Sequence, residues 1–261
     1  MAKVRLDALL TERGLFQSRS RAAASVLAGE VRLGGGEPAH KPGQLVSDDI
    51  ELEVVAPPPY VSRGGIKLAN ALDATGISVE GRRCLDVGAS TGGFTDCLLQ
   101  RGAKHVVAYD VAYGELDWRL RTHPRVTVIE RRNARELRTD ELPYRPDLVV
   151  VDVSFISLTK VLPAVLGAAA PRYDCLALVK PQFEAGRERV GSGGVVRDAA
   201  VRRAILVEVG EAARALGAAV VGFASSGLPG PKGNRETFVH LAEGERGGVG
   251  ELEAAVREVE P

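Results

Sequence analysis

Cysteine is scarce in this sequence, and the three cysteines lie far apart. Cys84, Cys97 and Cys175 form no Cys-x-x-Cys pair, so neither a zinc knuckle nor a disulfide framework is indicated. We expect each of them to be a small core residue. The sequence shows no other obvious cluster of metal-ligating residues, and it therefore predicts no metal cofactor.

Long hydrophobic runs are also missing. The weakly polar stretch at residues 161–170 is much shorter than the roughly 18 to 20 apolar residues that a membrane helix needs. The residues from Met1 to Asp7 lack the apolar run of a secretory signal and lead directly into a helical pattern. We therefore expect a cytoplasmic protein that does not associate with membranes.

An excess of charge of one sign is missing as well, because 34 Lys and Arg balance 34 Asp and Glu. This balance argues against a protein that coats nucleic acid indiscriminately. The charges are unevenly distributed, however: residues 1–33 contain six basic and three acidic residues, whereas residues 34–59 contain one basic and five acidic residues. A locally basic face is typical of selective polyanion binding, although a solvated helix face would give the same charge run.

The first part of the chain has the pattern of a small α+β domain. Leucines at helical spacing predict one helix before Gly14, and a second helix is expected between Ser18 and Gly29. Short strands are expected at 31–33 and 50–55, around the glycine turn at 34–36. The three prolines at 57–59 then predict a stiff connection and a domain boundary.

After the prolines, strand-like runs alternate with segments that can form helices, which is the pattern of a doubly wound parallel sheet. The expected strands are 83–87, 105–110, 126–129, 148–152, 175–180, 219–224 and 236–241. A long alanine-rich helix is expected at 198–216, and the segment after Glu243 is expected to end in a short exposed helix. We predict an α/β, Rossmann-like fold with a mostly parallel seven-stranded sheet.

A glycine-containing loop follows the first of these strands. It consists of Gly88, Ala89, Ser90, Thr91, Gly92 and Gly93. Its spacing departs from the Gly-x-Gly-x-x-Gly that cradles a pyrophosphate, so a dinucleotide is disfavoured, whereas S-adenosylmethionine requires close backbone approach without a phosphate nest. Asp110 lies 22 residues after Gly88, where a carboxylate can accept hydrogen bonds from ribose hydroxyls. An ordinary turn and a surface aspartate would give the same pattern.

Two ionisable residues end predicted core strands. Asp152 closes one apolar run and Lys180 closes another, so that both side chains would emerge at the carboxyl edge of a parallel sheet, where ligands bind. A charge at the end of a core strand is costly unless it is used or paired. A functional site is the favoured interpretation, and Asp152 is also a candidate cofactor contact. A plain Asp–Lys ion pair is the alternative.

Arginines mark a candidate RNA-binding surface. Arg19 and Arg21 fall in the first turn of the second predicted helix, where positive side chains oppose the helix dipole but can bind phosphate. Arg5 and Lys41 could extend this surface, and Arg63 at the domain junction could contact RNA or brace the hinge. Solvent-exposed arginines without a ligand are the alternative interpretation.

The sequence resembles the TlyA family, bacterial proteins labelled haemolysins that are similar to ribosomal RNA 2′-O-methyltransferases. The segment from Leu85 to Asp96, Leu-Asp-Val-Gly-Ala-Ser-Thr-Gly-Gly-Phe-Thr-Asp, carries the resemblance most clearly. The other matching segments are 5–34, 60–68, 151–158, 178–186 and 233–238. Because they span nearly the whole chain in order, the resemblance is specific.

The resemblance implies a domain organisation and an activity. It implies an S4-like RNA-binding domain at 1–59, a linker at about 56–62, an FtsJ-like methyltransferase domain at 63–243 and a C-terminal tail at 244–261. The expected cofactor is S-adenosylmethionine. The expected substrates are cytidine riboses within assembled ribosomal subunits, in 16S and 23S ribosomal RNA or in 23S ribosomal RNA alone.

The resemblance also implies a catalytic set, onto which Lys67, Asp152, Lys180 and Glu236 map without substitution. From spacing alone, neither Lys67 nor Glu236 would stand out. A ribose hydroxyl is a very weak acid, so its methylation needs a positioned base or an electrostatic aid. Burial favours neutral lysine, which suggests Lys180 as the base, whereas neighbouring carboxylates favour the ammonium form. Asp152 and Glu236 would orient the lysine and the substrate, and Lys67 would supply positive charge.

Other functions would leave different marks in the sequence. Enzymes that methylate exocyclic amines resemble one another in an Asn/Asp-Pro-Pro-Tyr motif, where this chain has Asp152-Val-Ser-Phe155, and cytosine C5 chemistry would need a nucleophilic cysteine. Two further alternatives are an RNA-binding protein with an inactive methyltransferase domain and a membrane-lytic haemolysin. The retained loop and polar set argue against the first, and the missing amphipathic cationic segment argues against the second.

Overall fold

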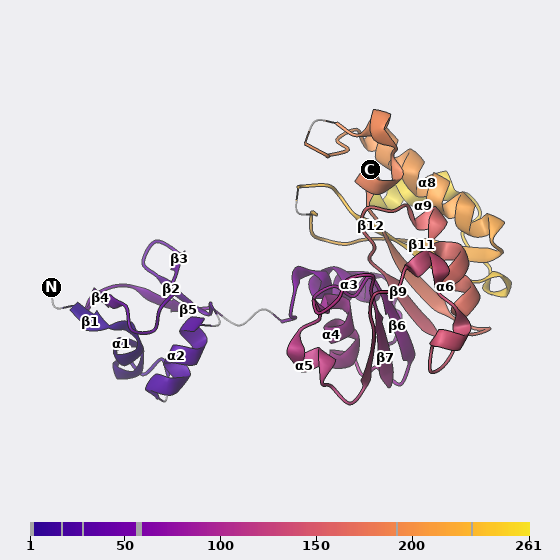
Figure 1. Cartoon of the computed structure of the whole chain (residues 1–261). Coiled ribbons are helices and arrows are strands. Elements are labelled where there is room, and N and C mark those ends of the chain that lie inside the picture. The colour runs from indigo at the N-terminus through magenta and orange to yellow at the C-terminus, as the bar shows by residue number, and fades with distance from the viewer. Residues whose placement is uncertain (1–2, 17, 28, 56–58, 192, 231) are drawn as a thin grey trace. The chain divides into compact units, whose positions relative to one another are not determined.

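The computed structural model describes residues 3–16, 18–27, 29–55, 59–191, 193–230 and 232–261. The chain divides into two compact units, Met1–Pro59 and Tyr60–Pro261 (Figure 1). Pro57 and Pro58 of the predicted linker lie outside the described residues. Each unit has its own hydrophobic core, and we describe each by itself.

The first unit is a small α+β structure. Its elements are β1 (Lys3–Arg5), α1 (Leu6–Glu12), α2 (Arg19–Leu27), β2 (Val31–Leu33), β3 (Glu37–Pro38), β4 (Leu45–Ser47) and β5 (Leu52–Val54). β1 pairs with β4, and β2 lies between β3 and β5, all antiparallel. Both helices lie where the sequence predicts them. β1, β3 and β4 were not expected, because two or three residues are too few to show a hydrophobic period.

In the described part of the second unit, seven strands form one sheet. They are β6 (Arg83–Val87), β7 (His105–Tyr109), β8 (Val126–Ile129), β9 (Leu148–Val151), β10 (Asp174–Val179), β11 (Ala218–Ser225) and β12 (Thr237–Glu243). Their order is β11-β12-β10-β9-β6-β7-β8, and β12 runs antiparallel to both of its neighbours. The predicted mostly parallel, Rossmann-like sheet is thereby confirmed. The strand order changes direction between β6 and β9, which makes this position the topological switch point.

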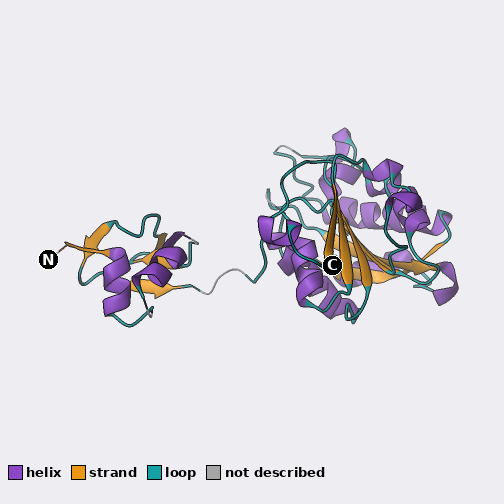
Figure 2. Cartoon of the chain, turned by 60° about the horizontal axis from the view of Figure 1, so that its bottom comes forward, coloured by secondary structure: helices purple, strands orange, loops and turns teal. Residues whose placement is uncertain are grey.

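Helices cover both faces of this sheet (Figure 2). α3 (Arg63–Thr75), α4 (Gly93–Gln100) and α5 (Trp118–Arg121) pack on one face, and α6 (Leu162–Ala168), α8 (Ala199–Ala215) and α9 (Leu252–Val259) pack on the other. The short α7 (Pro181–Glu184) follows β10. All three cysteines are free and buried, as expected. Cys84 and Cys97 lie in the core beneath α3, α4 and α5, and Cys175 lies in the core beneath α6, α8 and α9.

The segment after Glu243 differs from the prediction. It contains the expected helix, α9, but this helix is not simply exposed, because Leu252 and Val256 are buried in the core beside α8. A Cβ at Gly210 of α8 would lie only 2.9 Å from a methyl carbon of Leu252, so a glycine permits the close packing. The Gly- and Glu-rich composition of the segment concealed this apolar stripe.

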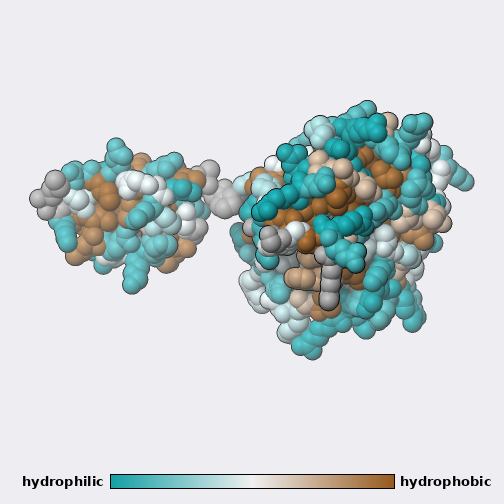
Figure 3. All heavy atoms as spheres, turned by 90° about the horizontal axis from the view of Figure 1, so that it is seen from above, coloured by the Kyte–Doolittle hydropathy of each residue, from teal (hydrophilic) through white to brown (hydrophobic). Residues whose placement is uncertain are grey.

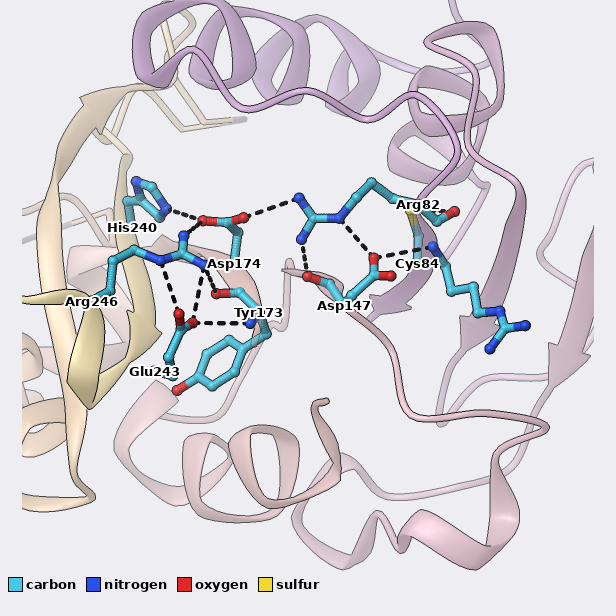
Figure 4. A network of polar contacts seen from close by, with 9 residues as sticks. Arg82, Cys84, Asp147, Tyr173, Asp174, His240, Glu243 and Arg246 are labelled. Atoms are coloured by element: carbon cyan, nitrogen blue, oxygen red, sulfur yellow. Dashed lines mark hydrogen bonds and ion pairs between the residues drawn. The ribbon is translucent and has the colours of Figure 1, made fainter. Parts of the chain in front are cut away.

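A polar network holds the amino ends of the parallel strands together (Figure 4). Arg82 bridges the carboxylates of Asp147, before β9, and Asp174, in β10, at 2.7 and 3.1 Å. His240 Nε2 of β12 lies 2.9 Å from Asp174 Oδ1, and Arg246 contacts the same oxygen. Although burial acts to raise it, the hydrogen bonds from His240 and Arg82 lower the pKa of Asp174 to about 2. The network therefore fixes the antiparallel strand β12 at the edge opposite to Asp152 and Lys180.

Candidate active site

The carboxyl ends of β6 and β9 meet at the switch point of the sheet, where ligands bind in doubly wound folds. Gly88 follows β6 with a φ of +87°, and a Cβ there would clash with the carbonyl oxygen of Asp152, the residue after β9. The amide of Asp152 donates to the carbonyl of Val87 at 2.9 Å. Glycine at position 88 therefore allows the two loops to approach each other closely.

A cavity of about 780 Å³ lies at this edge of the sheet, and its volume suits a small-molecule ligand. The predicted cofactor residues in its walls are Gly88, Ser90, Asp110 and Asp152. Among the described residues, the wall does not include the other predicted ones, Ala89, Thr91, Gly92 and Gly93. The sequence did not single out several further wall residues, which include Glu115, Asn133, Ser154 and Phe155.

The last two glycines of the loop serve helix packing. A Cβ at Gly93 would clash with the hydroxyl of Ser62 and would lie 2.9 Å from the amide nitrogen of Gly65 in α3. A Cβ at Gly92, whose φ is +98°, would clash with Leu120 of α5. These two glycines thus allow α4 to pack closely against its neighbours. Their spacing in the sequence could not show whether they serve helix packing or close approach of a cofactor.

Asp110, directly after β7, shapes the glycine loop. Its Oδ2 accepts a hydrogen bond from the amide of Ser90 at 2.7 Å, and its Oδ1 accepts one from the amide of Ala112, also at 2.7 Å. The carboxylate remains in the cavity wall and has lone pairs left for further donors. Its position is compatible with the predicted contact to ribose hydroxyls.

Asp152 and Lys180 form an ion pair at the carboxyl edge of the sheet. Lys180 Nζ lies 2.5 Å from Asp152 Oδ1 and donates to the hydroxyl of Ser154 at 2.9 Å. The side chain of Asp152 is 22% exposed and that of Lys180 is 12% exposed, so the pair is largely shielded from water. Asp152 lines the cavity. The amino group of Lys180 is thereby held in one place.

Lys67 and Glu236 form a second, more deeply buried ion pair. Lys67 comes from α3 and Glu236 from the residue before β12, and their side chains are 9% and 1% exposed. Val179 pairs with Thr237 across β10 and β12, so Lys180 and Glu236 are the next residues at the same sheet edge. The structure thus brings all four predicted residues to this edge as two pairs. Among the described residues that line the cavity, only Asp152 belongs to this set.

Asp86 is a buried acid that the sequence did not single out. It lies inside β6, where its Oδ2 accepts a hydrogen bond from the hydroxyl of Thr95 at 2.7 Å and its Oδ1 has no partner in the described structure. Burial, followed by the charges of Asp152 and Asp110, raises the pKa of Asp86 to about 7, against the opposing hydrogen bond from Thr95. A charged residue within an apolar strand was the sequence signal that could have found it.

Phe155 stands out in the cavity wall. It is 91% exposed, and its φ of +63° lies in a backbone region that residues other than glycine rarely adopt. Its ring centroid lies 5.1 Å from that of Phe183 in α7. A large aromatic side chain held exposed in a strained backbone points to a function rather than to packing.

The predicted RNA-binding arginines of the first unit converge in part. Arg5 Nη2 lies 2.7 Å from Asp7 Oδ2 and Arg19 Nη2 lies 3.2 Å from Asp7 Oδ1, while both guanidinium groups stay more than half exposed. The hydrogen bond from Arg5, with further help from Arg19, lowers the pKa of Asp7 to about 2. Arg21, in the first turn of α2, and Lys41 are also exposed. Asp7 therefore orders two cations of this surface.

Arg63, the remaining predicted RNA contact, begins α3 in the second unit. Its exposed guanidinium donates to the carbonyl of Pro229 at 2.8 Å, which ties α3 to the segment between β11 and β12. Arg63 thus has a bracing contact within its own unit. This contact leaves other donors of the guanidinium available for a ligand.

Two kinds of feature are missing from the described part of the chain. It contains no group of three or more His, Cys, Asp or Glu side chains placed to hold a metal ion. None of its helices has the length and apolar character needed to cross a bilayer.

Comparison with known proteins identifies the family. The model of the FtsJ-like methyltransferase family matches residues 60–243. The protein of Mycobacterium tuberculosis named 16S/23S rRNA (cytidine-2′-O)-methyltransferase TlyA is 53% identical over 241 residues, which cover 92% of this chain and 90% of that protein. The chain belongs to the TlyA family of FtsJ-like methyltransferases.

Other similar proteins carry the second name of the TlyA family. Hemolysin A of Brachyspira hyodysenteriae is 42% identical over 242 residues, which cover 91% of this chain and 99% of that protein. A solved structure from Streptococcus thermophilus, described as a candidate hemolysin, is 39% identical, with a TM-score of 0.75 and coverage of 99% of this chain and 96% of that one. The family assignment made from sequence motifs is therefore confirmed, and with it the enzyme class. The FtsJ-like match begins at residue 60, so the S4-like nature of the first unit stays a prediction.

Proposed function

We propose that this TlyA-family protein transfers the methyl group of S-adenosylmethionine to the 2′-hydroxyl of a cytidine ribose in 16S or 23S ribosomal RNA. The main supporting observation is the Asp152–Lys180 ion pair beside a cavity at the switch point. An acid in the cavity wall, with an amino group 2.5 Å away, suits chemistry on a weakly acidic hydroxyl. The name of the M. tuberculosis relative supports the choice of substrate.

The residues around the cavity fit S-adenosylmethionine. We assign Gly88 and Ser90, the two residues of the 88–93 loop that line the cavity, to its methionine and ribose portions. Asp110 would accept hydrogen bonds from the ribose hydroxyls. Asn133, whose Oδ1 accepts from the amide of Arg135 at 3.1 Å, has side-chain amide hydrogens to donate to the adenine edge. When bound, the cofactor supplies an electrophilic methyl group on a positively charged sulfur.

The proposed reaction is an in-line displacement. Bound S-adenosylmethionine would supply the methyl group to the 2′-oxygen and would leave as the neutral thioether. The hydroxyl proton would pass to the amino group of Lys180. Asp152, whose Oδ1 lies 2.5 Å from Lys180 Nζ, would then stabilise the resulting ammonium group. The buried Lys67–Glu236 pair would hold the far side of the site and place positive charge near the developing alkoxide.

Phe155 gives the target base a surface to stack on. Enzymes that act on a nucleotide within structured RNA take it out of its stack and place it against aromatic side chains. The exposed ring of Phe155, backed by Phe183, is in the cavity wall and is therefore suited to this role. The arginines of the first unit would grip RNA phosphates, which carry most of the binding energy but no sequence information.

Lys180→Ala tests the proposed base directly. We expect the turnover number to fall by at least about 100-fold, because general-base catalysis is lost, while calorimetric binding of S-adenosylmethionine changes little. Lys104→Ala, which removes an exposed lysine, serves as the control. Methylation at the normal rate by Lys180→Ala would exclude Lys180 as the base.

Cellular RNA tests the function as a whole. Mass-spectrometric mapping of ribose methylation in 16S and 23S RNA, from cells with and without the protein, should show one or more cytidines that lose their methyl group. An unchanged methylation map, with no binding of S-adenosylmethionine, would favour an inactive RNA-binding protein. Leakage of liposomes caused by the purified protein would favour the haemolysin alternative. Since ribosomal RNA is the proposed substrate, we infer that the protein acts in the cytoplasm.

A further inference from the structure

Glu260 is buried, at 2% exposure, although it lies outside every site considered so far. Its carboxylate contacts the guanidinium of Arg202, in the first turn of α8, with Nε and Nη2 at 2.9 and 2.5 Å from Oε1. Arg202 is also buried, at 8% exposure, and the more exposed Arg235 lies 3.5 Å from the same oxygen. Figure 1 places this end of the chain beside α8. A buried charge pair of this kind needs good hydrogen bonding, because removing both charges from water is costly.

Arg202 uses its remaining guanidinium nitrogen to hold the segment 194–197. Its Nη1 donates to the carbonyl oxygens of Val196 and Arg197, at 3.1 and 2.7 Å. The same segment is held from its other side by Asn234, whose Oδ1 accepts from the amide of Val196 at 2.9 Å and whose Nδ2 donates to the carbonyl of Gly194 at 2.8 Å. Asn234 is buried, at 2% exposure, so these contacts are shielded from water.

Asn234 lies two residues before Glu236 and shares a turn with it. The carbonyl of Asn234 accepts a hydrogen bond from the amide of Gly230 at 2.8 Å, and a Cβ at Gly230 would clash with Oε1 of Glu236. The other carboxylate oxygen of Glu236 contacts Lys67. A continuous series of contacts, which is buried at Arg202, Val196 and Asn234, therefore connects Glu260 to the Lys67–Glu236 pair.

Anchoring of α9 does not explain why a charge pair is used here. Leu252 and Val256 already bury the apolar side of α9 beside α8. An apolar pair in place of Arg202 and Glu260 would fill the same space, since buried ion pairs are commonly no more stabilising than well-packed apolar residues. A guanidinium group, however, can contact a carboxylate and two backbone carbonyls at the same time. The contacts to segment 194–197 are therefore what the pair adds.

We propose that Glu260 is a positioning residue for the reaction: by holding Arg202, it fixes segment 194–197 and Asn234 and thereby the carboxylate of Glu236 against Lys67. This inference rests on the proposed function, because it takes the Lys67–Glu236 pair to serve methyl transfer. Glu260 itself does not touch the substrate. It acts on the rate of the chemical step rather than on binding of the cofactor.

Glu260→Gln in the full-length protein tests this proposal, with Glu258→Gln as the matched control. Each variant replaces one carboxylate near the C-terminal end of α9 by an amide. Glu258 is exposed, whereas Glu260 is buried. Two measurements are compared: hydrogen–deuterium exchange of the amides of Val196 and Gly230, and steady-state methylation of ribosomal RNA. The second gives the turnover number and the KM for S-adenosylmethionine separately.

We expect Glu260→Gln to raise amide exchange at Val196 and Gly230 and to lower the turnover number roughly 10-fold, because small displacements in a catalytic site are costly. The KM for S-adenosylmethionine should stay within about twofold, since the cofactor loop is unchanged. Glu260→Asp, which keeps the charge, should recover part of both effects, and Glu258→Gln should behave as the wild type. Unchanged exchange at the two amides would overturn the proposal, as would raised exchange with an unchanged turnover number.

A second variant keeps the test decisive if Glu260→Gln does not fold. Arg202→Met combined with Glu260→Leu removes both buried charges and retains apolar volume, so the fold is expected to persist. The contacts to segment 194–197 are lost, so the amide exchange should rise and the turnover number should fall as before. A folded double variant with normal turnover would refute the positioning role. If the wild type methylates no RNA, the proposed function fails, while amide exchange still shows whether Glu260 fixes the segment next to Glu236.

Discussion

Asp86 shows how a single side chain makes the fold sensitive to pH. Its carboxyl group is fully buried in β6 and has one hydrogen-bonded and one unpartnered oxygen. Because its folded-state pKa is about 7 and its ordinary value is 3.8, the folded protein binds a proton that the unfolded chain has lost between these two values. The free energy of unfolding should therefore decrease as the pH rises from about 4 to 7.

Asp86→Asn should remove this dependence. The amide oxygen can still accept the hydrogen bond from Thr95, and no charge needs to be buried. We expect the stability advantage of the variant over the wild type to grow by on the order of 2 kcal/mol between pH 5.5 and pH 8.5, because the wild type continues to lose stability until the pH passes the folded-state pKa. Urea unfolding at both pH values measures the difference. A gap that is the same at both pH values would show that Asp86 does not titrate in this range.

Substitution of Phe155 is expected to affect the use of RNA and not the binding of S-adenosylmethionine. Loss of its exposed ring should weaken use of RNA, since stacking of a base on an aromatic side chain contributes roughly 1 to 3 kcal/mol. We expect Phe155→Ala to lower kcat/KM for RNA by about 5-fold to 100-fold, with unchanged binding of S-adenosylmethionine. Phe155→Tyr keeps the ring and should keep most of the activity. Equal losses in both variants would point to the strained backbone instead of the ring.

At the scale of elements, the sequence predicted the sheet better than the site. Continuous apolar runs made the strands of the second unit recognisable, and those at 83–87 and 126–129 match β6 and β8 at both ends. Asp152 and Lys180 were found because they follow such runs. Lys67 and Glu236 were not found in this way, since their proximity depends on how α3 packs near the beginning of β12. The family resemblance, and not spacing, pointed to them.

The network around Asp174 is an element-scale feature that makes a measurable contribution. Asp174→Asn should lower the free energy of unfolding by about 3 kcal/mol at pH 7, because Arg82 and Arg246 lose a shared, nearly buried counter-charge. Since the folded-state pKa of Asp174 is about 2, its stabilising effect is complete above pH 4 and is lost as the pH falls toward 2. The difference between wild type and variant should shrink over that range in urea titrations. The control Asp140→Asn, in an exposed ion pair, should leave the free energy of unfolding nearly unchanged.

Helix α2 makes a prediction about RNA affinity. Replacing both Arg19 and Arg21 by Ala should weaken binding of ribosomal RNA and reduce the slope of log K against log salt by up to about 2, because phosphate contacts determine this slope. Filter binding at several salt concentrations measures it. Lys104→Ala with Arg257→Ala removes two exposed charges from the second unit and provides the control. If the control pair flattens the slope as strongly, the effect belongs to net charge and not to α2.

At the scale of the whole molecule, most of the candidate RNA-binding residues and the candidate active site lie in different units. The basic residues Arg5, Arg19 and Arg21 lie in the first unit, whereas the cavity and both lysine–carboxylate pairs lie in the second. Seen from above, the second unit shows hydrophobic residues gathered between hydrophilic ones (Figure 3). Each unit has its own core, as expected of domains that can fold separately.

This division predicts what the second unit does alone. A fragment of residues 60–261 retains the complete sheet, the cavity and the two ion pairs, so it should fold and bind S-adenosylmethionine with an affinity within about threefold of the full chain. Its KM for ribosomal RNA should rise by at least about 100-fold, because linked binding surfaces raise the effective concentration of the substrate at the site. Calorimetry and steady-state methylation measure the two quantities. A folded fragment that does not bind the cofactor would mean that residues 1–59 contribute to the cofactor site, and unchanged use of RNA would mean that the first unit does not grip the substrate.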